Sequence, residues 1–139
     1  MTANTIVSTP DGPGELLIDP ATEPRAVLVL GHGAGSDVTG WDLALLARDL
    51  PPLGVTVARY RQPHRVAGRK LPGSTASLDR GWAPALAAVA ELCPELPLFA
   101  GGHSAGARTA CRGAGVDAGI VVWGVVALSF PLHPPGQPA

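Results

Sequence analysis

The stretch LPLFAGGHSAGAR at residues 96–108 decides how the rest of this 139-residue sequence is interpreted. Its first, apolar part predicts a strand, and the alanine-rich part that begins at Ala105 predicts a helix. Between them lies a G-x-S-x-G motif, with Gly102, Ser104 and Gly106 at its fixed positions. A serine in a sharp turn between a buried strand and a helix has the geometry of a nucleophile elbow. The sequence therefore predicts Ser104 as a nucleophile.

The small residues around Ser104 fit this interpretation. A strained turn leaves no room for side chains two positions before and after the serine, and both positions are glycine. The N-terminus of the following helix would stabilise negative charge that develops beside the serine. The alternative is a glycine turn that joins a strand to a helix without chemistry, in which case the motif occurs by chance.

A second glycine-rich loop follows an unbroken apolar run at residues 26–30, which is typical of a strand buried on both faces. Such a loop supplies one N–H group of an oxyanion hole, and the residue after the nucleophile supplies the other. The candidate donors are the backbones of Gly33, Ala34 and Ala105. A phosphate-binding loop is the alternative, but a G-x-G-x-x-G pattern would need glycine where Ser36 stands.

Apolar runs alternate with segments of helical periodicity along the chain. We expect a β-hairpin at residues 5–9 and 15–18, strands at 26–30, 55–58, 96–100 and 125–130, and helices at 41–50, 75–92 and 105–111. The polar loop at 61–74 is long enough to suggest a function. This alternation predicts one α/β domain, residues 1–139, with a mostly parallel sheet and helices on both faces.

The residues that would complete a catalytic triad are few. After Ser104 the sequence holds one carboxylate, Asp117, and one imidazole, His133, in the order that this fold uses. Asp117 falls between the helix after the elbow and the next strand, so we expect it at the wrong end of the sheet. His133 is the candidate base. His103 precedes the serine and is expected to point away from it.

Charge and composition exclude several classes of function. The net charge is -1, which provides no field for nucleic acid, and 46% hydrophobic residues exclude a charged disordered tail. The one basic cluster (Arg59, Arg61, Arg65, Arg69 and Lys70) is expected to form a solvated loop. The three tryptophans (Trp41, Trp82 and Trp123) are expected to anchor the core.

Targeting and metal signals are not found in the sequence. The N-terminus has no basic and apolar segments of a secretory signal, and the longest apolar run, residues 118–130, is too short to span a bilayer. We therefore expect a cytoplasmic protein that contacts no membrane. The His and carboxylate positions show no ligand spacing, so neither a metal nor a cofactor is expected.

Five blocks in the same order resemble the α/β-hydrolases, and within them the dienelactone-hydrolase-like branch, in the group named for testis-expressed protein thirty and the NSL-complex subunit three. The blocks are LGHGAGS (30–36), RQP with GR (61–63 and 68–69), LDRGW (78–82), GGHSAGAR (101–108) and SFPLHPPG (129–136). The resemblance implies that Ser104 is the nucleophile and that Gly33, Ala34 and Ala105 are oxyanion donors. It also implies further strands and helices beyond the last block, with the acid and histidine on them, so we expect a C-terminally truncated domain.

Three functions follow from these observations. The first is a serine hydrolase of small ester or acyl substrates, impaired because the acid and histidine of the triad are absent. The second is a non-catalytic scaffold or regulatory protein on a hydrolase-like fold, whose exposed edge strand at 125–130 pairs with a partner or a second copy. The third is an incomplete product that folds poorly.

Overall fold

A single mixed sheet organises the computed structural model, which describes residues 2–115, 119–133 and 136. Its six strands lie in the order β1-β2-β4-β3-β5-β6. The strands are β1 (Ala3–Val7), β2 (Gly14–Asp19), β3 (Ala26–Gly31), β4 (Val55–Arg61), β5 (Leu98–His103) and β6 (Val122–Leu128). The helices are α1 (Trp41–Asp49), α2 (Pro63–Val66), α3 (Thr75–Leu92) and α4 (Ala105–Ala114), with a short 3-10 turn, η1 (Pro51–Leu53).

The strands β4, β3, β5 and β6 run parallel, whereas β1 and β2 form an antiparallel hairpin that joins β4. The predicted α/β fold is therefore confirmed. In this register Gly31 at the end of β3 pairs with Gly102 on β5. The loop after β3 consequently lies beside the turn after β5, at the edge where the parallel strands end.

Several boundaries differ from those predicted: β1 lies two residues earlier, β4 continues to Arg61, and the predicted loop at 61–74 contains α2. The strand β5 begins at Leu98 rather than at residue 96 and continues to His103, because Gly101 and Gly102 stay extended and pair with β3 and β6. The strand β6 begins at Val122 and ends before Ser129, whose positive φ of 47° breaks the extended backbone.

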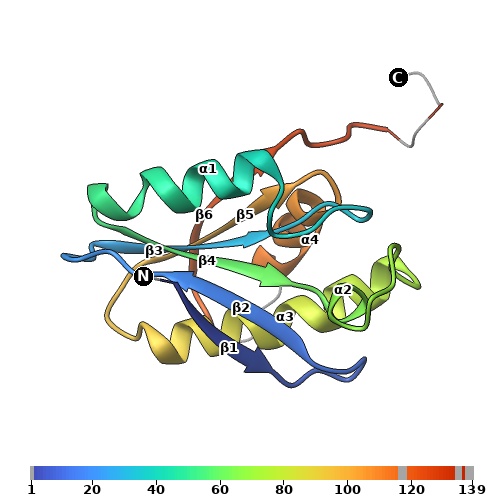
Figure 1. Ribbon diagram of the computed structural model, residues 1–139, viewed down its shortest axis with the longest axis horizontal. Helices are drawn as coiled ribbons and strands as arrows, with labels where there is room; N and C mark the ends of the chain where they lie inside the picture. Colours follow the sequence, from blue (N-terminus) through green and yellow to red (C-terminus); the bar gives the residue numbers. More distant parts are fainter. Residues whose placement is uncertain (1, 116–118, 134–135, 137–139) are drawn as a thin grey trace.

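Side chains alternate between the two faces of the sheet, and each face has its own core. Val27 and Val29 of β3 belong to a cluster with residues of α3 and α4, whereas Leu28 and Leu30 belong to a cluster with α1. This is the period of two that a strand imposes on its side chains. Helices thus cover both faces, as predicted, with α1 and α3 on opposite sides of the sheet (Figure 1).

The long helix α3 has a clear start and a clear buried face. The Ser77 N–H donates to Ser74 Oγ at 3.1 Å and the Ser74 N–H donates to Ser77 Oγ at 3.2 Å, which forms a capping box. Trp82, Leu86 and Val89 recur at helical spacing and are buried. The helix runs through Pro84, although a proline inside a helix usually kinks or breaks it.

The expectation that all three tryptophans anchor the core is wrong for two of them. Trp82 is 1% exposed, but Trp41 is 77% and Trp123 is 68% exposed. Trp41 is the first residue of α1, and Trp123 lies on the edge strand β6, so neither is enclosed by neighbouring elements. In the part of the chain that the structure describes, no helix has the length and apolar character needed to cross a membrane.

Candidate active site

The backbone of Ser104 is strained. This residue stands between β5 and α4 with φ 53° and ψ −110°, a conformation that costs a non-glycine residue roughly 1–3 kcal/mol. Its N–H donates to the Leu128 carbonyl at 2.9 Å, and its carbonyl accepts from the Arg108 N–H at 3.1 Å. Ser104 is half-buried, so it is not enclosed in the core. The surrounding contacts therefore hold a strained serine at the rim of the sheet.

The two motif glycines are required by packing. A Cβ atom on Gly106 would lie 2.2 Å from the Gly31 carbonyl oxygen, and one on Gly102 would lie 2.4 Å from the same atom. No side chain is tolerated at such distances without moving the backbone. The start of α4 and the end of β5 thus pack directly against the backbone at the end of β3.

The loop after β3 touches the elbow. A Cβ atom on Gly106 would lie only 2.7 Å from the His32 carbonyl oxygen, and one on Gly33 would lie 3.4 Å from Cδ2 of His103, the residue before Ser104. Among the described residues, the Gly33 and Ala34 N–H groups donate to no protein atom. The Ala105 N–H is in the first turn of α4, where no intrahelical acceptor exists. The three predicted oxyanion donors therefore come from two segments in contact.

Two buried histidines fix the orientation of this loop. The Gln62 N–H donates to His32 Nε2 at 3.1 Å, so His32 carries its proton on Nδ1 and donates it to the Gly33 carbonyl at 2.7 Å. The Nε2–H of His64 donates to the Ala34 carbonyl at 3.3 Å. Because a trans peptide directs its N–H opposite to its carbonyl, holding the Gly33 carbonyl also holds the Ala34 N–H.

Both of these histidines are neutral at pH 7. Burial is the largest cause and lowers the pKa of His32 and that of His64 below their ordinary values. Their hydrogen bonds to the Gly33 and Ala34 carbonyls oppose this effect without reversing it. This role of the two histidines could not be found from the sequence, because their partners lie about 30 positions away in the chain.

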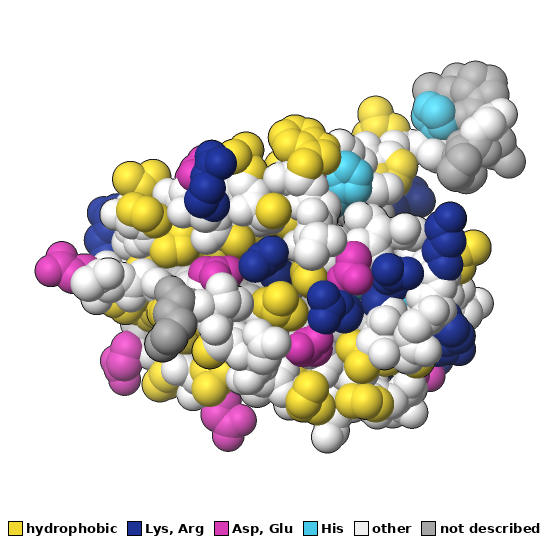
Figure 2. Space-filling view, viewed as in Figure 1, with side chains coloured by type: hydrophobic (Ala, Val, Ile, Leu, Met, Phe, Trp, Pro, Cys, Tyr) yellow, Lys and Arg dark blue, Asp and Glu magenta, His cyan; other side chains and the backbone are white. Residues whose placement is uncertain are grey.

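The basic cluster is only partly the solvated loop that the sequence predicted. Arg61 bonds Asp37 at 2.8 Å and also pairs with Glu15, while Arg65 lies 3.4 Å from Asp37. Arg59 pairs with Asp19 at 3.2 Å. These arginines are part-buried beside carboxylates that come from β2 and from the segment after the glycine-rich loop, whereas Arg69 and Lys70 are exposed, as expected. Figure 2 shows basic and acidic side chains interleaved on this face.

The carboxylate of Asp37 is also held by this cluster. Burial would raise the pKa of Asp37, but hydrogen bonds from Arg61 and from the Val38 N–H outweigh it and lower the pKa. Asp37 lies directly after the glycine-rich loop. The ion pairs therefore fix the far end of that loop to β2, β4 and α2.

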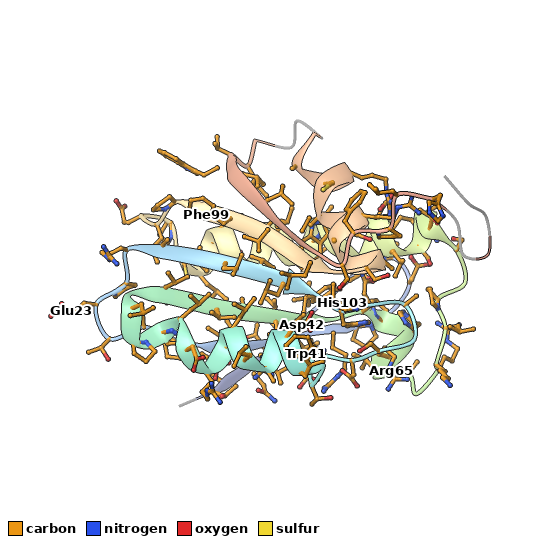
Figure 3. The ribbon with its side chains drawn as sticks, turned by 90° about the horizontal axis from the view of Figure 1, so that it is seen from above. Glu23, Trp41, Asp42, Arg65, Phe99 and His103 are labelled. Carbon is orange, nitrogen blue, oxygen red and sulfur yellow. The ribbon has the colours of Figure 1, made fainter. Side chains whose placement is uncertain are left out.

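The remaining triad candidates are not brought together in the described structure. Asp117 lies outside the described residues. His133 is exposed and follows β6, and its assignment as the base stays a prediction. A different pair does meet: His103 Nδ1 lies 2.6 Å from Asp42 Oδ2 on α1 (Figure 3). This pair could not be predicted from the sequence, because the two residues are 61 positions apart.

A sequence profile decides the family. The profile of the alpha/beta hydrolase domain matches residues 24–139. The chain belongs to the alpha/beta hydrolase domain family. A search of curated protein sequences gives no significant match.

Solved structures share the fold of this alpha/beta hydrolase. An alpha-beta serine hydrolase homologue from Coxiella burnetii superposes with a TM-score of 0.81 at 18% identity over 94% of this chain. A dienelactone hydrolase from Anabaena variabilis gives a TM-score of 0.77 at 16% identity over 91% of this chain. A lidless a/b serine hydrolase from Xanthomonas campestris gives 0.72 at 20% identity over 94%.

This alpha/beta hydrolase chain spans 64%, 62% and 62% of the lengths of the Coxiella, Anabaena and Xanthomonas chains, respectively. The family predicted from the sequence is confirmed at the level of the α/β-hydrolases, with a dienelactone hydrolase among the structural neighbours. No group of three or more His, Cys, Asp or Glu side chains within residues 2–115, 119–133 and 136 is arranged to hold a metal ion.

Proposed function

We propose that this protein is a serine hydrolase of small ester or acyl substrates, with Ser104 as its nucleophile. The observation that carries the proposal is the strained backbone of Ser104 at a strand–helix turn whose flanking glycines pack on β3. Strain of this kind persists only where surrounding contacts enforce it, and it is concentrated at functional sites. The group named for testis-expressed protein thirty and the NSL-complex subunit three is the proposed subfamily.

The chemistry follows from the groups around the serine. Ser104 Oγ attacks the carbonyl carbon of the ester and loses its proton to a base, for which His133 is the candidate. The carbonyl oxygen becomes an oxyanion that accepts hydrogen bonds from Ala105 and from Ala34 or Gly33. The alcohol then leaves with a proton, and water releases the acyl group from Ser104.

Labelling with a fluorophosphonate tests the nucleophile. The wild-type protein is expected to form one adduct, and peptide mass spectrometry should locate it on Ser104. Ser104→Ala should reduce labelling at least about a thousandfold, as removal of a triad serine does. Ser129→Ala is the matched control, because Ser129 also has a positive φ, 47°. Equal labelling of wild type and Ser104→Ala would refute the proposal.

The assignment of His133 is tested separately. If its imidazole is the base, His133→Ala should slow labelling of Ser104 about a hundredfold or more, the range of general-base catalysis. Unchanged labelling would remove His133 from the mechanism and leave Ser104 in place.

The exposed strand β6 favours a second candidate function, self-association in a non-catalytic protein. Within the part of the chain that the structure describes, the strand pairs with β5 alone, and Val121, Trp123 and Val126 on or beside it are strongly or partly exposed. Residues 118–133 contain no Asp, Glu, Lys or Arg, so two copies meet without charge repulsion. Sedimentation equilibrium over a range of protein concentrations is the test: a dimer supports this candidate, and a monomer that turns over esters excludes it.

A further inference from the structure

A small cavity lies between the glycine-rich loop and the start of α1. Its volume is about 100 Å³. Cavities that hold drug-sized ligands are several times larger, roughly 300–1,000 Å³, so this one admits only a short group. The lining includes Gly33, Ser36, Gly40, Trp41, Asp42 and His103. The cavity therefore borders a candidate oxyanion donor and the residue that precedes Ser104.

The wall of the cavity on the elbow side is the His103 ring, and Asp42 holds this ring in place. His103 Nδ1 lies 2.6 Å from Asp42 Oδ2. The other oxygen, Oδ1, accepts the Leu43 N–H at 2.9 Å, so the carboxylate is itself anchored to the first turn of α1. The Asp42 side chain is 13% exposed, and that of His103 is 33% exposed. Figure 3 shows both residues with Trp41 at this end of α1.

The position of the ring sets the width of the cavity. A Cβ atom added to Gly33 would lie 3.4 Å from His103 Cδ2, so the ring faces Gly33 across a space about as wide as one methyl group. Because Nδ1 is bonded to Asp42, the ring cannot turn away from the loop without breaking that bond. Removing the His103 ring would enlarge the cavity by the volume of the ring and open the space beside Gly33.

The charges around the cavity favour an uncharged occupant. Asp37 and Asp42 both line it, and neither Lys nor Arg is among the described lining residues. Arg61 and Arg65 neutralise Asp37 from outside the cavity. An acidic group placed here would face the two carboxylates, whereas a short neutral acyl chain would face Trp41 and Leu43.

We propose that this cavity receives the acyl chain of the substrate and that His103 limits this chain to about two or three carbons, with Asp42 as the residue that positions the ring. The inference rests on the proposed function, because it places the acyl carbonyl between Ser104 and the N–H groups of the loop. His103 is then a specificity-determining residue, and its role is separate from the choice of the base.

The test compares two neutral esters, p-nitrophenyl acetate and p-nitrophenyl hexanoate. Wild type should prefer acetate in kcat/KM by at least about tenfold, since a pocket discriminates by 10–200-fold per misfitting methylene. His103→Ala should abolish or reverse this preference, mainly by lowering KM for hexanoate. An unchanged ratio in His103→Ala, with turnover still dependent on Ser104, would overturn the inference and leave the proposed function standing.

Asp42 is tested with a conservative variant and a matched control. Asp42→Ala should relax the preference for acetate because the His103 ring is released, whereas Asp42→Asn should retain most of it because an amide oxygen still accepts the hydrogen bond. Asp49→Ala is the control, since Asp49 lies at the exposed far end of the same helix. If Asp42→Ala keeps the preference of the wild type, the positioning role is refuted.

A binding measurement separates this inference from the catalytic proposal. Acetamide and hexanamide are neutral analogues that need no turnover, and Trp41 in the cavity wall is the fluorescent reporter, with Trp41→Phe as the control for the other tryptophans. Tighter binding of acetamide in wild type, lost in His103→Ala, supports the cavity even if Ser104 is never labelled. If neither amide changes the Trp41 signal, the cavity is not the acyl site.

Discussion

The strands β3 and β6 are similarly apolar in sequence, yet they have opposite environments. Five of the six residues of β3 are buried, whereas no residue of β6 is fully buried. The strand β3 lies between β4 and β5 with helices on both faces, while β6 pairs with β5 alone among the described strands. The position of a strand in the sheet, and not its apolar composition alone, therefore decides whether the strand is buried in the core.

The two strands also support the elbow in different ways. The backbone at the end of β3 packs directly against Gly102 and Gly106. Close packing on both sides of Ser104 therefore holds the turn in place. The end of β6 contributes the Leu128 carbonyl, which accepts the Ser104 N–H. The geometry of the nucleophile should therefore depend strongly on β3 and weakly on the side chains of β6, and four predictions test this difference.

The largest effect is expected where β3 meets the helix of the elbow. Gly106→Ala should lower the free energy of unfolding by more than about 3 kcal/mol, because its Cβ would overlap the Gly31 carbonyl. Gly115→Ala, just after the other end of α4, places its Cβ 3.7 Å from the Arg112 carbonyl oxygen, its nearest neighbour among the described residues, and should change stability little. Urea denaturation measures both, and equal losses would contradict the close packing described here.

The next effect compares matched truncations in the two strands. Leu30→Ala on β3 should cost about 2–5 kcal/mol, because it leaves a cavity at a fully buried position. Val126→Ala on β6, where the side chain is 38% exposed, should cost less than about 1 kcal/mol. Urea denaturation measures the free energy of unfolding of both variants. The two losses can be compared directly if the variants have the same m-value. Similar losses at both sites would mean that β6 is buried in solution.

A smaller effect on the free energy of unfolding depends on pH and comes from His32, the residue after β3. Its pKa is lowered in the folded state, so below the ordinary value of 6.5 the unfolded chain binds a proton that the folded chain does not. The free energy of unfolding should therefore fall as the pH drops from 7 to 5, by at most about 1.4 kcal/mol per pH unit for this group. His32→Asn should flatten the slope over that range. A wild-type curve without slope would show that His32 is not buried.

The smallest effect on stability is expected from a charge placed on β6. Val126→Lys should change the free energy of unfolding by less than about 0.5 kcal/mol, as surface substitutions do. The same change should dissociate any dimer that forms through this edge, because two lysines would face each other across the pair. Sedimentation velocity measures the dissociation, and a dimer that persists in Val126→Lys must use another surface.

Much of the fold could be predicted because its signals are local. The buried run of β3 and the helical spacing of α3 predicted these elements, and the glycines on either side of Ser104 predicted a tight turn between β5 and α4. The exposure of Trp41 and Trp123 could not be predicted in this way, since a tryptophan has the same side chain at an edge as in a core. The burial of Arg59 and Arg61 could not be predicted either, because the carboxylates that pair with them come from a distant segment of the chain.

The sequence by itself determined the family, the order of strands and helices, and the position of the serine turn, because these depend on periodicity and on residues close together in the chain. The tertiary structure alone decided that His32 and His64 hold the glycine-rich loop, that Asp42 holds His103, and that β6 is left exposed. Those contacts join residues separated by about 30 to 60 positions, and only the pairing and packing of the sheet bring them within bonding distance.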